Sequence, residues 1–123
     1  MITIVFCVRK RPDLSDEEFR RIWWEEHGPF VKERAKTLRM KRYVQMPRLL
    51  EPGFESVASA RGAPEPFDGV AQVSWESMDD LKSTFTDPAA RRCARELLED
   101  ERRFIDFPRS PIFFTEEKVV VSE

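Results

Sequence analysis

The spacing of hydrophobic and polar positions along the chain is that of a strand in some stretches and that of a helix in others. The first stretch has the pattern of a buried strand. In residues 2–9 both alternating faces are apolar, with Ile4 and Phe6 on one face and Val5 and Cys7 on the other. A strand that is apolar on both faces is typical of a central position in a sheet that is covered on both sides. The pattern therefore predicts a central strand at the start of the chain.

A helical pattern follows this strand. Ser15 and Glu18 have the spacing of a capping box, and apolar residues then recur at helical spacing over residues 19–31. Pro29 cannot donate a backbone hydrogen bond, and the residue before a proline avoids the α region. We therefore expect the helix to end or kink just before this proline, and a second helical piece to start with it and continue to about residue 38.

The rest of the chain predicts three more strands and a second helical region. The strand patterns cover residues 39–46, 68–76 and 111–121. Ser77 and Asp87 stand where helix N-caps are expected, and Pro88 restarts the helix at its first turn. Residues 47–67 are rich in Pro, Gly, Ser and Ala. A long flexible loop of this kind is either a functional lid or an inert connection.

The predicted element order is β-α-β-β-α-β, the split βαβ pattern of ferredoxin-like folds. Right-handed crossovers place both helices on one face of a four-stranded antiparallel sheet, which makes the fold class α+β. The other face would then lie open, although the first strand is apolar on both sides. A second copy packed sheet to sheet would cover that face. We therefore expect a single domain over residues 1–123 that forms a homodimer, as in a dimeric α+β barrel.

Composition narrows the function classes that suit the chain. Its 123 residues include 21 basic and 23 acidic residues, for a net charge of −2, and 41% are hydrophobic. Nucleic acids and anionic membranes select for a strongly basic face, so neither is an expected partner. No stretch approaches the roughly 20 apolar residues of a membrane span, and the first residues do not have the order of a signal peptide. We therefore expect a cytoplasmic protein.

The cysteine and histidine content gives no support for a metal site. Cys7 and Cys93 are the only cysteines, and two distant thiols predict small buried residues rather than a disulfide framework. No CxxC or HExxH motif and no second histidine is present to complete a zinc site. Nucleotide-binding motifs and the nucleophile elbow of serine hydrolases are also absent. We therefore expect neither a metal nor a cofactor.

His27 is the residue on which the candidate chemistry depends. It follows Trp23 by four residues and lies at the edge of the apolar helix stripe. An imidazole at this place can take up or release a proton near pH 7, whereas the alternative is a core-edge histidine bonded to a backbone carbonyl. A catalytic base needs an orienting partner. The candidates are Asp100, Glu101 and Asp106, of which the first and last are our predicted catalytic partners.

Polar and aromatic positions predict a ligand pocket between the sheet and the helices. Tyr43 and Gln45 share one face of the second strand, and Gln72 and Ser74 share one face of the third. Polar groups in a half-buried sheet need partners, and an apolar cleft with a few of them suits a planar aromatic ligand. A sheet edge or a polar patch in the dimer interface is the alternative. The residues expected to bind the substrate are Phe19, Trp23, Tyr43, Gln45, Gln72 and Trp75.

Five segments carry family motifs in order along the chain. They are LSDEEFRRIWWEEHGPFV at 14–31, RYVQ at 42–45, FDGVAQVSWESMDDL at 67–81, EDERRFIDF at 99–107 and EEKVVV at 116–121. Together they resemble the EthD-domain family of the dimeric α+β barrel superfamily. The first segment is similar to the first-helix signature of that family, in which a Phe and a Trp precede His-Gly-Pro. The resemblance places a histidine of the family at His27.

The resemblance implies a small-molecule function. The wider superfamily includes cofactor-free monooxygenases, cyclases, decarboxylases, isomerases and dehydratases, together with haem-dependent members, so the fold does not decide the reaction. We expect an enzyme that acts without a cofactor on a hydrophobic aromatic or polyketide-like substrate by acid–base chemistry at His27. It would be a cyclase, dehydratase, decarboxylase or cofactor-free monooxygenase. The alternatives are an accessory or ligand-binding protein of a degradation or biosynthesis pathway, and an assembly module without a ligand.

Overall fold

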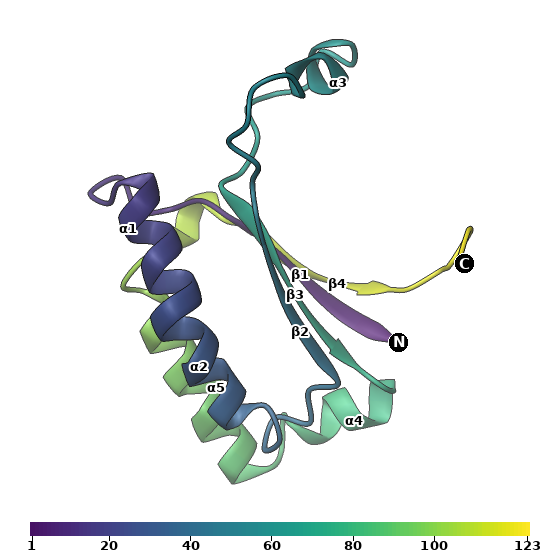
Figure 1. Ribbon diagram of the computed structural model, residues 1–123. Helices are drawn as coiled ribbons and strands as arrows, with labels where there is room; N and C mark the ends of the chain where they lie inside the picture. Colours follow the sequence, from purple (N-terminus) through teal and green to yellow (C-terminus); the bar gives the residue numbers. More distant parts are fainter.

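The computed structural model describes residues 1–123 and contains one four-stranded antiparallel sheet with helices on one face (Figure 1). The strands are β1 (Ile2–Val8), β2 (Arg42–Pro47), β3 (Gly69–Trp75) and β4 (Ile112–Glu116). Their order in the sheet is β2-β3-β1-β4, and each neighbouring pair is antiparallel. This arrangement confirms the predicted ferredoxin-like α+β fold, with β1 as a central strand.

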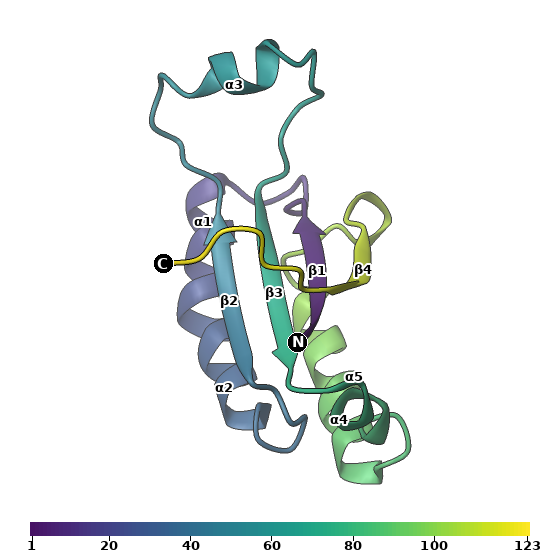
Figure 2. The ribbon, with the colours of Figure 1, turned by 90° about the vertical axis from the view of Figure 1, so that its right-hand side faces the viewer.

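Helices form a second layer against one face of the sheet, apart from one short helix, α3, on a projecting arm (Figures 1 and 2). They are α1 (Asp16–Arg21), the π-helix η1 (Ile22–His27), α2 (Gly28–Arg34), α3 (Glu55–Ser59), α4 (Met78–Ser83), α5 (Pro88–Glu101) and the 3-10 helix η2 (Phe107–Arg109). Three helices begin at the predicted N-caps. The side chains of Ser15, Ser77 and Asp87 each accept a hydrogen bond from a backbone N–H in the first turn.

The first helical region continues through Pro29 instead of ending before it. α1, η1 and α2 follow one another directly, and His27 and Gly28 both keep right-handed helical backbone angles. The change in hydrogen bonding comes before the proline, where the Gly28 N–H bonds to the carbonyl of Trp23 five residues earlier. Pro29 stands in the first turn of α2, as predicted, where a missing N–H is tolerated. The predicted end or kink is therefore replaced by a π-helical segment.

The buried core lies between the first helical region and the sheet. Phe19 and Trp23 pack with their ring centroids 5.2 Å apart, and they contact Phe6 of β1 and Phe104 beyond α5. β3 begins against the same indole ring. A Cβ atom at Gly69 would lie only 2.7 Å from the Trp23 ring, so the close approach of this strand needs a glycine.

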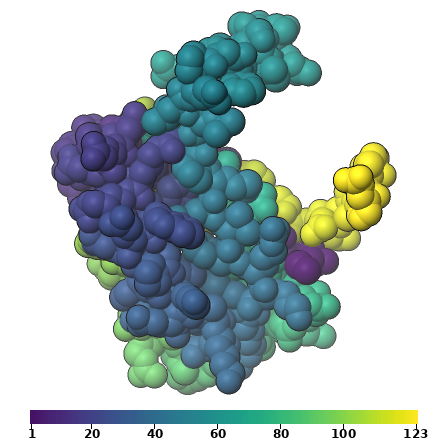
Figure 3. All heavy atoms as spheres, in the orientation of Figure 1, coloured from purple at the N-terminus to yellow at the C-terminus, as the bar shows by residue number.

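Two segments project from this body, as the space-filling view shows (Figure 3). The predicted loop over 47–67 is an arm that carries α3, and it exposes the apolar side chains Leu49, Leu50, Phe54 and Val57. β4 ends at Glu116, so the last strand is shorter than the predicted 111–121. The chain beyond it passes in front of the sheet face that the helices leave open (Figure 2). That C-terminal segment exposes Val119, Val120 and Val121.

Candidate active site

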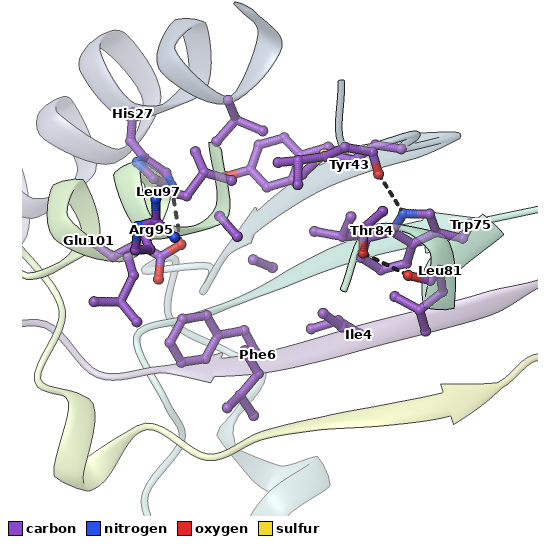
Figure 4. Close-up of a pocket in the computed structure, with 18 of the residues that line it drawn as sticks. Ile4, Phe6, His27, Tyr43, Trp75, Leu81, Thr84, Arg95, Leu97 and Glu101 are labelled. Carbon is purple, nitrogen blue, oxygen red and sulfur yellow. Dashed lines mark hydrogen bonds and ion pairs between the residues drawn. The ribbon is translucent and has the colours of Figure 1, made fainter. Parts of the chain in front are cut away.

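A cavity of about 530 Å³ lies between α5 and the helix-facing side of the sheet (Figure 4). Nineteen of its 24 lining residues are hydrophobic, and they come from β1, β2, β3, β4 and from the helices around them. Its mouth is lined by apolar side chains that are each more than 40% exposed: Phe85, Leu98, Ile112 and Phe114. The volume and the apolar lining are those of a small-molecule site.

His27 lies in the wall of this cavity between two neighbouring carboxyl groups of α5. Its Nδ1 is 2.7 Å from Oδ2 of Asp100, and its Nε2 is 3.7 Å from Oε2 of Glu101 (Figure 4). His27 is 3% exposed, and its ring centroid lies 5.0 Å from that of Phe104 in an edge-to-face arrangement. An ionised carboxylate only accepts hydrogen bonds, so Asp100 fixes the proton on Nδ1. The lone pair of Nε2 then faces Glu101 and the cavity.

The π-helix η1 positions this histidine. Trp23 and His27 both line the cavity from η1, and the Trp23 carbonyl accepts the Gly28 N–H from five residues ahead. The same carbonyl accepts a second hydrogen bond, at 2.8 Å, from Nε2 of Gln45 on β2. The irregular helical turn is therefore tied to the sheet beside the cavity. π-helical turns occur frequently at functional sites.

A chain of charged side chains orients the Asp100 carboxylate. Arg103 donates to Oδ1 of Asp100 at 2.9 Å and also to Glu26 at 2.9 Å. Glu26 in turn accepts a 2.7 Å hydrogen bond from Arg21. Asp100 thus has one oxygen bound to Arg103 and the other bound to His27, which leaves it little freedom to rotate away from the imidazole.

Burial sets the protonation states of the two groups that face each other in the cavity. Desolvation lowers the pKa of His27 below its usual value of 6.5, although the Asp100 carboxylate opposes this shift. Desolvation also raises the pKa of Glu101 to about 8, and the negative charge of Asp100 adds to that effect. Near pH 7 the imidazole is therefore a neutral base, and Glu101 is a protonated acid beside it. Pairs whose pKa values are pushed apart in this way are suited to acid–base chemistry.

Tyr43 adds a hydroxyl group to the cavity wall (Figure 4). Its oxygen accepts a 2.9 Å hydrogen bond from Nε2 of Gln45, and no protein group accepts its own proton. Burial raises the pKa of Tyr43 to about 12, so the hydroxyl stays protonated at neutral pH. It can therefore donate a hydrogen bond to a ligand oxygen. Gln45, which makes this hydrogen bond, does not itself line the cavity.

The predicted substrate-binding residues divide between the cavity and other places. Trp23, Tyr43 and Trp75 line the cavity, whereas Phe19 packs against Trp23 in the core. Gln72 lies opposite Val5 and Val44 in the sheet register, on the face that points away from the helices. Gln72 and Trp75 are three residues apart, so the pleat of a strand sends them to opposite faces. Of the two, only Trp75 lines the cavity.

Asp106 also lies away from the imidazole. Its backbone N–H donates to the carbonyl of Arg9, and its carboxylate faces Arg109 at 3.5 Å. Of the three candidate partners, Asp100 contacts His27, and Glu101 lies across from Nε2 in the cavity wall. α5 ends at Glu101 and the chain then turns back toward β1, so Asp106 does not line the cavity and does not contact His27.

Apart from this group of residues, the structure shows few features that suggest other chemistry. Cys7 and Cys93 are both free. No group of three or more His, Cys, Asp and Glu side chains has the arrangement of metal ligands. None of the helices combines the length and the apolar character needed to cross a lipid bilayer.

The family model of the EthD domain matches residues 11–108, most of the chain. The protein therefore belongs to the EthD family, which confirms the resemblance drawn from its motifs. A search of curated protein sequences gave no significant match.

Solved structures of similar fold come from bacteria and from the plant Arabidopsis thaliana. An ethyl tert-butyl ether degradation (EthD) family protein of Bacillus halodurans C-125 has a TM-score of 0.61 at 10% identity, over 96% of this chain and 100% of that one. A dimeric protein of unknown function with a ferredoxin-like fold, from Bacteroides fragilis, has a TM-score of 0.57 at 11% identity, over 94% and 95%. SnoaB of Streptomyces nogalater, a cofactor-independent oxygenase, has a TM-score of 0.53 at 13% identity, over 99% and 97%. At these identities the likeness shows the fold.

Proposed function

We propose that this EthD-family protein is an enzyme that moves a proton on a hydrophobic aromatic or polyketide-like substrate without a cofactor. The observation that carries the proposal is geometric: Nε2 of the buried His27 lies 3.7 Å from Oε2 of Glu101 in the wall of an apolar cavity. Burial there lowers the pKa of His27 and raises the pKa of Glu101 to about 8. Groups of this kind give efficient general acid–base catalysis because their pKa values bracket neutral pH. The likeness to a cofactor-independent oxygenase supports a reaction of this class.

The geometry suits removal of a proton from a carbon next to a carbonyl group. Nε2 of His27 takes the proton from that carbon, and the C–H electron pair becomes the carbon–carbon double bond of an enol. Glu101 gives its proton to the carbonyl oxygen, and Tyr43 donates a hydrogen bond to the same oxygen. The positive charge that develops on the imidazole is stabilised by Asp100 at Nδ1. The enol then cyclises, loses a leaving group or reacts with oxygen, depending on the substrate.

The experiment that tests this proposal uses 2-tetralone, an aromatic ketone with an acidic C–H next to its carbonyl. In D2O, removal of the proton and its return appear as deuterium at that carbon, which NMR or mass spectrometry measures. We expect the protein to speed this exchange above the buffer rate. Oxygen uptake, followed in the same solution, separates an oxygenase from a lyase or cyclase. Binding of the ketone without faster exchange would instead point to a ligand-binding protein.

We further propose that the protein forms a homodimer through the open face of its sheet. The side chains that point to this face, away from the helices, include Val5, Cys7, Val44, Val70 and Phe113. Phe113 is 48% exposed in the single chain, and Gln72 lies on the same face opposite Val5 and Val44. Exposed apolar side chains that gather beside a polar one are typical of an interface. The Bacteroides fragilis protein of similar fold is described as dimeric, which supports a second copy as the occupant. The cytoplasmic location stays a prediction.

Sedimentation at micromolar concentration should give twice the chain mass of 14.5 kDa. A buried, unpaired charge is costly, so Val44→Asp on the open face should yield a monomer. Val57→Asp is the matched control, because Val57 is exposed on the arm and away from the sheet face. A wild-type protein that sediments only as a monomer would contradict the dimer, and so would equal effects of the two variants.

A further inference from the structure

Two arginines of α5 form part of the cavity wall and have no ionic partner. Arg91 and Arg95 are one helical turn apart, and both line the cavity that holds His27 and Glu101 (Figure 4 labels Arg95). Neither guanidinium group makes a hydrogen bond or an ion pair within the protein. Residues four apart on a helix have neighbouring side chains, so a single anion can contact both.

The carboxylates nearest to them along the helix are bound to other arginines. The three pairs are Asp87 with Arg39 at 3.3 Å, Glu96 with Arg34 at 3.3 Å, and Glu99 with Arg102 at 3.2 Å. These pairs use the side chains that could otherwise neutralise Arg91 and Arg95. The two cations at the cavity are thus left without a partner, although α5 carries several acidic residues.

The cavity itself supplies no opposite charge. Glu101 is the only carboxyl group among its lining residues, and burial keeps it protonated near neutral pH. His27 is neutral in the same range. An apolar ligand in this cavity would therefore lie beside two unbalanced positive charges. Both arginines are exposed, as are Phe85 and Leu98 at the mouth, so the two charges stand where the cavity opens to solvent.

We infer that the substrate is a hydrophobic acid, whose aromatic body fills the cavity and whose carboxylate is bound at the mouth by Arg91 and Arg95. This inference rests on the proposed function and names the substrate class of the same site. The guanidinium fork matches a carboxylate with two parallel hydrogen bonds, so two such groups side by side suit this anion. Binding of the acid group at the mouth would orient the reacting carbon toward His27 and Glu101.

The test compares two probes of nearly equal shape, 2-naphthoate and its neutral analogue 2-naphthamide, by isothermal titration calorimetry. The wild-type protein should bind the acid at least about tenfold more tightly than the amide, the size expected for charge-assisted hydrogen bonds. The Arg91→Gln/Arg95→Gln variant should bind both probes equally. Arg92→Gln is the matched control, because Arg92 lies on the same helix but does not line this cavity, and it should keep the preference.

Three results of the calorimetric titrations would overturn the inference. They are equal affinity of the wild-type protein for the two probes, a preference that survives the double substitution, and no binding of the acid at millimolar concentration. NMR signals of the His27 ring must also move when 2-naphthoate binds, since an acid bound elsewhere on the surface would leave them unchanged. The proposed function is tested by a different result. A protein that prefers the acid but does not speed deuterium exchange of 2-tetralone would support the substrate class and contradict the proton-transfer chemistry.

Discussion

Replacing His27 by alanine should slow the deuterium exchange of 2-tetralone by about 10²–10⁴-fold, the contribution expected of a positioned general base. The imidazole is the only group in the cavity wall that is both basic and neutral near pH 7. Oδ2 of Asp100 lies 2.7 Å from Nδ1 and keeps the imidazole proton on that nitrogen. Nε2 is therefore free to accept a proton. No other lining residue has a lone pair of comparable basicity, so little residual catalysis should remain.

His27→Gln provides the control for this substitution, because the alanine variant also removes packing against Phe104. Glutamine can donate to Asp100 and fills much of the same space, but its amide is not a base. Both variants should lose the exchange activity while circular dichroism shows a folded protein. An active His27→Gln variant would show that the histidine acts through the structure and not through proton transfer.

Replacing Glu101 by glutamine should remove the alkaline limb of the pH–rate profile and slow exchange near neutral pH by about 10²-fold. The wild-type rate depends on a deprotonated His27 and a protonated Glu101. It should therefore rise with pH through the lowered pKa of the histidine, below 6.5, and fall as the pH passes the Glu101 pKa of about 8. Glutamine cannot give up a proton, so its variant should show the rise without the fall.

Glu99→Gln is the matched control for this profile. Glu99 lies two residues away on α5, where it pairs with Arg102 on the surface, and it does not line the cavity. Its removal should leave the bell-shaped profile unchanged. An alkaline limb that persists in the Glu101→Gln variant would assign the acid to another group and would contradict the role given to this carboxyl.

The elements of the fold follow from local patterns in the sequence. The capping residues Ser15, Ser77 and Asp87 stand at helix starts, and the apolar faces of residues 2–9 predict a central strand that the structure confirms. At Pro29 the local pattern predicts a helix end or kink that the structure does not have. The chain keeps its helix through a π-helical segment, in which the Trp23 carbonyl also accepts a hydrogen bond from Gln45 of β2, a contact that no local pattern predicts.

The candidate site is less accessible to sequence reasoning because it depends on contacts between distant segments. Asp100 is 73 residues from His27, and three acidic residues near the end of α5 were equivalent candidates until the fold selected among them. The role of Glu101 depends on its burial in the cavity, which no sequence pattern shows. For Gln72 the sequence alone is sufficient: its odd spacing from Trp75 places the two side chains on opposite faces of the strand.

NMR titration of His27 tests the central claim most directly, and the chain has only one histidine, so the ring signals need no assignment. The free protein should show a pKa below the usual 6.5, because burial disfavours the charged imidazole. Addition of 2-naphthoate should shift the ring signals and change that pKa, since the ligand would lie against Nε2. A ring that titrates at or above 6.5, or whose signals stay the same with every ligand, would make His27 a structural residue and would contradict the proposed chemistry.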